Sequence, residues 1–148
     1  MIDKQNTLRV VATEARTAPN TSVLIAGGAG AAGARAAETI GADLRRTVSR
    51  IDLAALVSKY LGETEKNLDV LLRDAEQANA VLLVDEADAL FGKRTDVKDS
   101  HDRYANLDVN ALLARIERYH GVVVLATNAS TNIDPAFKRR IRYTIDGT

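Results

Sequence analysis

Short apolar runs alternate along this chain with longer stretches in which apolar residues recur every three or four positions. The runs predict β-strands over residues 22–27, 47–52, 81–86, 122–127 and 141–146. Helical spacing predicts one helix from about residue 34, one over about 63–78 and one over about 102–119. The strands over 47–52, 81–86 and 122–127 are apolar on both faces and end in polar residues, as buried parallel strands do.

This alternation predicts a parallel sheet between two helical layers, a three-layer α/β/α fold. In such a sheet, ligands bind at the carboxyl ends of the strands. The polar segment 91–103 interrupts the pattern and predicts an exposed loop. Pro135 follows Asp134 and predicts the start of a short helix there.

Composition indicates an ordinary globular domain. The chain has 148 residues, of which 46% are hydrophobic and 27% charged, which predicts a single domain. Twenty basic residues balance twenty acidic ones, so charge indicates neither a nucleic acid nor a membrane as partner. No apolar stretch is long enough to span a bilayer, and the first residues do not resemble a secretory signal. Without cysteine there is no thiolate metal site, and we expect a cytoplasmic protein.

The strongest chemical signal is Asp85–Glu86, at the end of an apolar run. Two carboxylates there would lie at the ligand edge of the sheet, where Asp85 can hold Mg²⁺ through water and Glu86 can polarise an attacking water. The dipeptide alone is equally consistent with a strand that runs into a polar turn.

Two further features fit the same chemistry. Asn128 directly follows the apolar run 122–127 and carries a side chain able to orient a water near a γ-phosphate. Arg139, Arg140 and Arg142 precede the last strand, and a guanidinium suits phosphate because it is planar, charged and bidentate. Taken alone, the arginines would be interpreted as a solvated basic turn.

Together these motifs resemble the AAA+ ATPases over residues 22–146. In their order along the chain, Asp85 and Glu86 match the Walker B acids, Asn128 matches sensor 1, and Arg139 and Arg142 match the arginine fingers. Residues 57–68 resemble the first pore loop and its following helix, with Tyr60 as the aromatic residue that grips a threaded polypeptide. The segment 98–117 is similar to the helix after Walker B in a bacterial subgroup.

The resemblance implies a P-loop NTPase-type sheet in the order 5-1-4-3-2, with ATP or ADP and Mg²⁺ as ligands. The family forms hexamers and acts on polypeptides. From the resemblance we expect one large subdomain over residues 1–148, without the helical lid that follows the last strand in the family, and a monomer in dilute solution.

The phosphate loop departs from the family pattern. Aligned without gaps, G-P-P-G-T-G-K-T falls on residues 27–34, and Gly27 and Gly30 match. The lysine position holds Gly33, and the position of the magnesium-binding threonine holds Ala34. Neither side chain can replace the one that is missing, so ATP hydrolysis should be impaired or lost.

The same loop fits a dinucleotide fingerprint. Gly28, Gly30 and Gly33 satisfy G-x-G-x-x-G between a strand and a helix, and Asp52 ends the next strand, where a Rossmann protein binds the ribose. A Rossmann-like module that binds NAD is therefore an alternative, although no Tyr-x-x-x-Lys pair of a dehydrogenase is present. A run of glycine and alanine is also what an erased P-loop would show, whether through natural decay or engineering.

Overall fold

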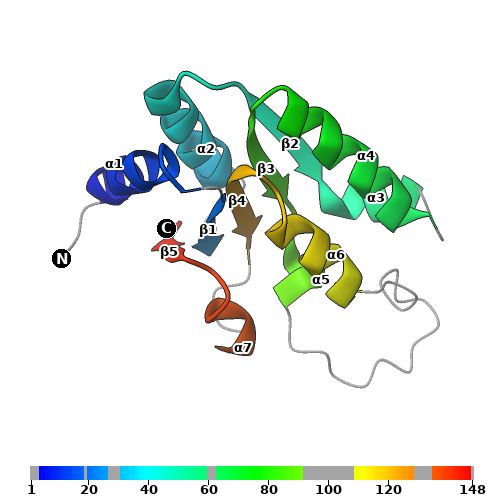
Figure 1. Cartoon of the computed structure of the whole chain (residues 1–148). Helices are drawn as coiled ribbons and strands as arrows, with labels where there is room; N and C mark the ends of the chain where they lie inside the picture. Colours follow the sequence, from blue (N-terminus) through cyan, green and yellow to red (C-terminus); the bar gives the residue numbers. More distant parts are fainter. Residues whose placement is uncertain are drawn as a thin grey trace.

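A computed structural model of the chain describes residues 4–18, 20–26, 31–59, 63–91, 109–128 and 135–147. Its parallel sheet has the order β2-β3-β4-β1-β5 (Figure 1). The strands are β1 (Asn20–Ala26), β2 (Val48–Asp52), β3 (Val81–Asp85), β4 (Gly121–Thr127) and β5 (Tyr143–Asp146). The predicted order 5-1-4-3-2 is confirmed, with β3 paired to β2 on one side and to β4 on the other.

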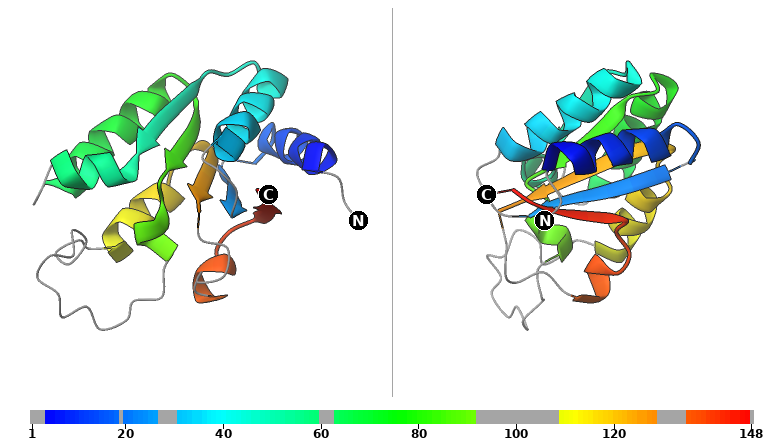
Figure 2. Two further views of the ribbon diagram at one scale, coloured as in Figure 1. Left: turned by 180° about the vertical axis from the view of Figure 1, so that it is seen from behind. Right: turned by 90° about the vertical axis from the view of Figure 1, so that its left-hand side faces the viewer.

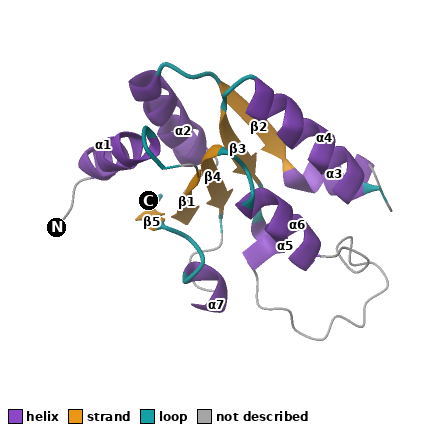
Figure 3. Ribbon diagram, in the orientation of Figure 1, coloured by secondary structure: helices purple, strands orange, loops and turns teal. Residues whose placement is uncertain are grey.

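Helices cover both faces of the sheet (Figure 3). Helices α1 (Lys4–Ala15) and α2 (Ala31–Leu44) pack on one face, in a core with Val23, Leu83 and Val124. The other face carries α3 (Leu53–Lys59), α4 (Thr64–Gln77), α5 (Asp88–Phe91) and α6 (Val109–Glu117). In the described part of the chain, no helix is long and apolar enough to cross a membrane.

Burial explains why the central strands were the easiest to predict. All of β3 is buried, and so is β4 after its first residue, because both strands have helices on both faces. Gly121 begins β4 with φ +133°, a conformation that side chains rarely adopt, and this glycine lets the chain turn out of α6.

The boundaries of several elements differ from the prediction. Strand β1 begins two residues early, at Asn20, and β5 begins two residues late, at Tyr143. The short helix at Pro135 is confirmed as α7 (Pro135–Lys138). Helix α6 begins at Val109 in the described residues, and the predicted start near residue 102 lies outside them.

Helices α1, α3 and α5 were not predicted from the sequence. Helix α1 buries Leu8, Val11, Ala12 and Ala15, a helical spacing in which two alanines give a weak apolar signal. Helix α3 follows β2 without a connecting residue, so Val57–Lys59, predicted as part of a loop, are helical. No loop residues separate the strand from the helix, so the sequence shows no boundary between β2 and α3.

Candidate functional site

The carboxyl ends of the strands form one edge of the sheet, and most of the predicted site residues that the structure describes lie there. All described strand pairs are parallel, so β2, β3 and β4 present Asp52, Asp85 and Thr127 at the same edge. Helix α2 follows β1 at this edge (Figure 2). The site is therefore assembled from segments distant in sequence.

Asp85 is the most enclosed acid of the edge, with a side chain only 7% exposed. Its Oδ2 lies 2.6 Å from a guanidinium nitrogen of Arg50 on β2, and its Oδ1 accepts a 2.9 Å hydrogen bond from the backbone N–H of Glu86. A carboxylate removed from water needs such partners to remain charged. Both oxygens of Asp85 thus have partners within the protein.

Glu86 has φ +54°, which is unusual for a residue with a side chain. The turn after it is fixed to β4, because the N–H of Ala87 donates to the carbonyl of Ala126 over 3.0 Å. The hydroxyl of Thr127 also donates to the carboxylate of Asp88. These contacts hold Glu86 in a strained conformation beside Asp85, as is common at functional sites. Asn128 follows Thr127 and is exposed.

Gly33 lies in α2 against the sheet. A Cβ built on it would be 2.6 Å from the Cβ of Ala126 and 3.5 Å from Cδ1 of Leu83. Position 33 therefore lies close to β3 and β4, and a side chain there would require α2 and β4 to move apart. Ala34, the next residue, packs at the margin of the same core and has no hydroxyl.

Asp52 ends β2, where its Oδ1 accepts a 3.0 Å hydrogen bond from the N–H of Ala55. This bond caps the first turn of α3 and gives Asp52 a structural task. The dinucleotide alternative requires β1 and β2 to be neighbours, whereas β3 and β4 separate them. The observed order favours the P-loop type of sheet.

The arginines lie away from Asp85. Arg142 precedes β5, and its backbone N–H donates to the hydroxyl of Ser22 near the start of β1, so it lies toward the amino edge of the sheet. Its Nε lies 2.9 Å from Glu14 on α1, and the charge of Glu14 raises the pKa of Arg142. Arg140 pairs with Glu117 over 2.7 Å, while Arg139 is exposed. Within one chain, the structure does not bring the arginines and the acids together.

Four predicted positions cannot be placed. Gly27, Gly28, Gly30 and Tyr60 lie outside the described residues.

Sequence reasoning missed Arg50, Asp88 and Thr127. The available signal for Arg50 was a charged residue inside a strand, two positions before an acid at the strand's end. Asp88 lies two positions after Glu86, and Thr127 directly precedes Asn128, so both were within reach of the motifs that the sequence shows. Their pairing depends on which strands are neighbours.

Comparison with known proteins decides the family. The sequence pattern of the ATPase family associated with various cellular activities (AAA) matches residues 23–146. The chain belongs to the AAA family. This AAA domain is 32% identical over 130 residues to a proteasome-activating nucleotidase of Aeropyrum pernix, covering 84% of the chain and 32% of that protein. It is 33% identical over 123 residues to the ATPase family gene 2 protein of Schizosaccharomyces pombe, covering 82% of the chain and 15% of that protein.

The AAA domain thus spans about a third or less of the length of these relatives. Among solved structures, the FIGL-1 AAA domain in complex with ADP superposes with a TM-score of 0.75 and 21% identity, over 96% of this chain and 51% of that one. This likeness concerns the fold.

Membership of the family implies ATP or ADP with Mg²⁺ as ligands. The residues of this AAA domain suit the nucleotide phosphates better than they suit the metal ion. The first turn of α2 offers backbone N–H groups to phosphate. For Mg²⁺, Ala34 supplies no hydroxyl, and both oxygens of Asp85 have protein partners. The described residues contain no cluster of three or more His, Asp or Glu side chains that could hold a metal ion. The donor set therefore does not fit Mg²⁺.

Proposed function

We propose that this AAA domain is a nucleotide-binding module that binds ATP or ADP weakly and hydrolyses ATP slowly or not at all. The observation that carries the proposal is the packing of Gly33, where a Cβ would lie 2.6 Å from Ala126. The lysine that contacts the β- and γ-phosphates in a working P-loop has no counterpart at this position. Ala34 likewise leaves out the hydroxyl that binds Mg²⁺.

Weak nucleotide binding remains because α2, with 14 residues, begins beside the end of β1. The N-terminus of a helix attracts phosphate through its free N–H groups and its dipole. Glu86 and Asn128 keep the roles inferred from the sequence, facing the γ-phosphate region at the carboxyl edge. Without a lysine they have no tightly held phosphate on which to act.

Arg139 and Arg142 have no role in a single chain of the proposed module, and would act only if a second copy placed its nucleotide against them. Their place toward the amino edge of β5 supports this, because Asp85 of the same chain lies at the opposite edge. Tyr60 is proposed as a contact for a polypeptide substrate. Relatives named as proteasome-activating nucleotidases are consistent with a polypeptide, although they are far longer.

For the isolated chain we expect a monomer in dilute solution. Arg142 is tied to Glu14 and Arg140 to Glu117 within the chain, so these arginines are not held ready for a partner. Light scattering should give the mass of one chain, about 16.0 kDa, and a stable ring would contradict this expectation.

The test is titration calorimetry with ATP, ADP, NAD and NADP, together with phosphate release. We expect weak binding of ATP and ADP and turnover well below the order of 1 per second that is typical of working enzymes. The variant Gly33→Lys/Ala34→Thr should be made with Ala126→Gly, which removes the methyl group that position 33 meets. This triple variant should bind ADP at least about tenfold more tightly.

Motor-like turnover by the native chain would refute the proposal. A preference for NAD over ADP that Asp52→Ala narrows would restore the dinucleotide alternative, in which Asp52 binds the ribose.

A further inference from the structure

Arg50 lies on the outermost strand β2, on the face of the sheet that α2 covers. Its register partner on β3 is Leu83, which belongs to the core beneath α1 and α2. Partners in register share a face, so Arg50 and Asp85, two residues beyond Leu83, project to the same side. Leu83 also contacts the Cβ position of Gly33, which puts Arg50 one strand away from the beginning of α2.

The contact between Arg50 and Asp85 is close and asymmetric in exposure. The nitrogen–oxygen distance is 2.6 Å, the Asp85 side chain is 7% exposed and the Arg50 side chain is 62% exposed. The acid is therefore enclosed, while the guanidinium extends to the surface at the ligand edge. We infer that Arg50 takes the place of a divalent cation at Asp85, so that nucleotide binding by this domain does not depend on Mg²⁺.

This inference rests on the proposed nucleotide site. It adds which group of the protein neutralises negative charge there. The guanidinium of Arg50 supplies a positive charge directly beside the carboxylate of Asp85. Mg²⁺ would need an oxygen of this carboxylate, directly or through water, and would have to approach Arg50, a like charge. Among the neighbouring acids, Asp52 caps α3 and Asp88 accepts from Thr127, so each already has one carboxylate oxygen engaged within the protein.

The same geometry supplies a positive charge where the loop has lost one. A guanidinium has five N–H donors in a planar fork that matches phosphate oxygens, and the contact with Asp85 orients this fork. Because Arg50 is mostly exposed, its outer donors can meet an anion at the carboxyl edge. Arg50 thus replaces, in part, both the lysine absent at position 33 and the metal ion.

The test compares the native chain with Arg50→Ala, using Mn²⁺ and ADP as probes. Binding of Mn²⁺ removes the paramagnetic resonance signal of the free ion, so it can be followed without nucleotide and without catalysis. Arg73→Ala is the matched control, since Arg73 is also an exposed arginine paired with an aspartate, over 2.9 Å, but lies on α4. Titrations with ADP are done with Mg²⁺ and with a chelator.

For the native chain and Arg73→Ala, we expect no Mn²⁺ binding, and replacing the chelator with Mg²⁺ should change ADP affinity less than about threefold. Arg50→Ala should bind Mn²⁺, and its ADP affinity should rise at least about tenfold with Mg²⁺. The double variant Arg50→Ala/Asp85→Asn should lose both the Mn²⁺ binding and the rise in ADP affinity with Mg²⁺.

Two results would overturn the inference: an ADP affinity of the native chain that Mg²⁺ raises about tenfold or more, or an Arg50→Ala variant that folds and gains no Mn²⁺ binding. If Arg50→Ala does not fold, Arg50→Gln takes its place, because glutamine keeps an N–H donor beside Asp85 but removes the positive charge. Arg50→Gln should likewise gain Mn²⁺ binding, and a folded Arg50→Gln variant without Mn²⁺ binding would refute the inference. Failure of the native chain to bind any nucleotide would instead refute the proposed function, while the Mn²⁺ titration would still report on Arg50.

Discussion

Gly33 of α2 and Ala126 of β4 are so close that a methyl group on residue 33 would lie 2.6 Å from the methyl group of Ala126. Helix α2 therefore rests directly on the sheet at the point where the family pattern has its lysine. Such contact is the role of the third glycine in a dinucleotide loop, and here it occurs in a sheet of P-loop order.

Gly33→Ala should destabilise the fold by about 1–3 kcal/mol through overpacking, although alanine is the better helix former. Urea denaturation measures the change. Ala126→Gly should reduce the loss in the double variant, because the two methyl groups then no longer meet. A Gly33→Ala variant more stable than the native chain would show that α2 does not pack this closely.

Glu86 has φ +54°, so its identity should matter for stability as well as chemistry. Glu86→Gly and Glu86→Ala both remove the carboxylate, but only glycine adopts a positive φ without strain. Glu86→Gly should therefore be more stable than Glu86→Ala by about 1 kcal/mol. Equal unfolding free energies would mean that the turn relaxes to a negative φ.

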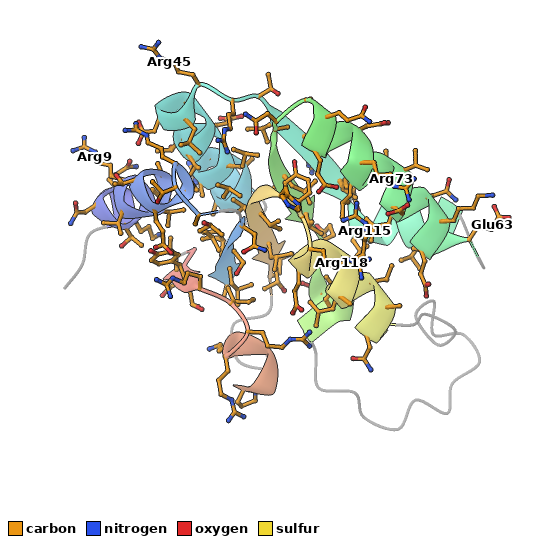
Figure 4. All side chains as sticks on the ribbon, viewed as in Figure 1. Arg9, Arg45, Glu63, Arg73, Arg115 and Arg118 are labelled. Atoms are coloured by element: carbon orange, nitrogen blue, oxygen red, sulfur yellow. The ribbon has the colours of Figure 1, made fainter. Side chains whose placement is uncertain are left out.

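Arg115 joins α4 to α6 and lies between them (Figure 4). Its Nε lies 2.6 Å from Asp69 and a terminal nitrogen 2.8 Å from Glu76. The hydrogen bond from Arg115 lowers the pKa of Asp69. For Glu76, burial favours a higher pKa, but the hydrogen bonds from Arg115 and from the His120 backbone N–H outweigh it and lower the pKa.

Arg115→Ala should accordingly lower the melting temperature by about 5 °C, and Arg73→Ala, which removes an exposed pair, much less. Because the folded-state pKa values are lowered, the stabilisation is present above the ordinary values of 3.8 and 4.5 and is lost as the pH falls below them. The difference in melting temperature between the native chain and Arg115→Ala should thus become smaller at acid pH. A melting-temperature difference that stays constant with pH would argue against these ion pairs.

Tyr119 is fully buried and donates a 2.6 Å hydrogen bond to the carbonyl of Ala80. Burial, with the nearby charge of Glu76, raises its pKa from 10.0 to about 12. Tyr119→Phe should cost about 1–2 kcal/mol at neutral pH, because the Ala80 carbonyl loses its donor.

Since the folded-state pKa of Tyr119 is raised, the associated stability is complete below pH 10.0 and is lost as the pH rises toward about 12. The stability difference between the native chain and Tyr119→Phe should therefore shrink over this interval. Thermal melts at a series of alkaline pH values measure it, and a difference that grows would contradict the assignment.

Much of the fold could be predicted because the signals are local. Strands β3 and β4 are buried on both faces and hence continuously apolar in sequence, and α4 shows its helical spacing directly. Asp85, Glu86 and Asn128 follow such strands, so their position at the carboxyl edge needed only the rule that parallel strands end together. Helices α1 and α3 were not predicted. In α1 the alanines weaken the helical spacing of apolar residues, and in α3 the cap residue Asp52 is also the last residue of β2, so the sequence shows no boundary between them.

The sequence by itself determined which residues form the sheet and which polar groups stand at its edge, since both depend on the chemistry of neighbouring positions. Only the tertiary structure decided which other residues those groups contact. Arg50 meets Asp85 because β2 lies beside β3, and Gly33 is closed off because α2 lies on Ala126 of β4. These contacts join residues that lie 35 and 93 positions apart in the sequence, and no local pattern records a pairing over such a separation. The glycine at position 33 can be read from the sequence, whereas the arginine beside the acid appears only when the strands are in their order.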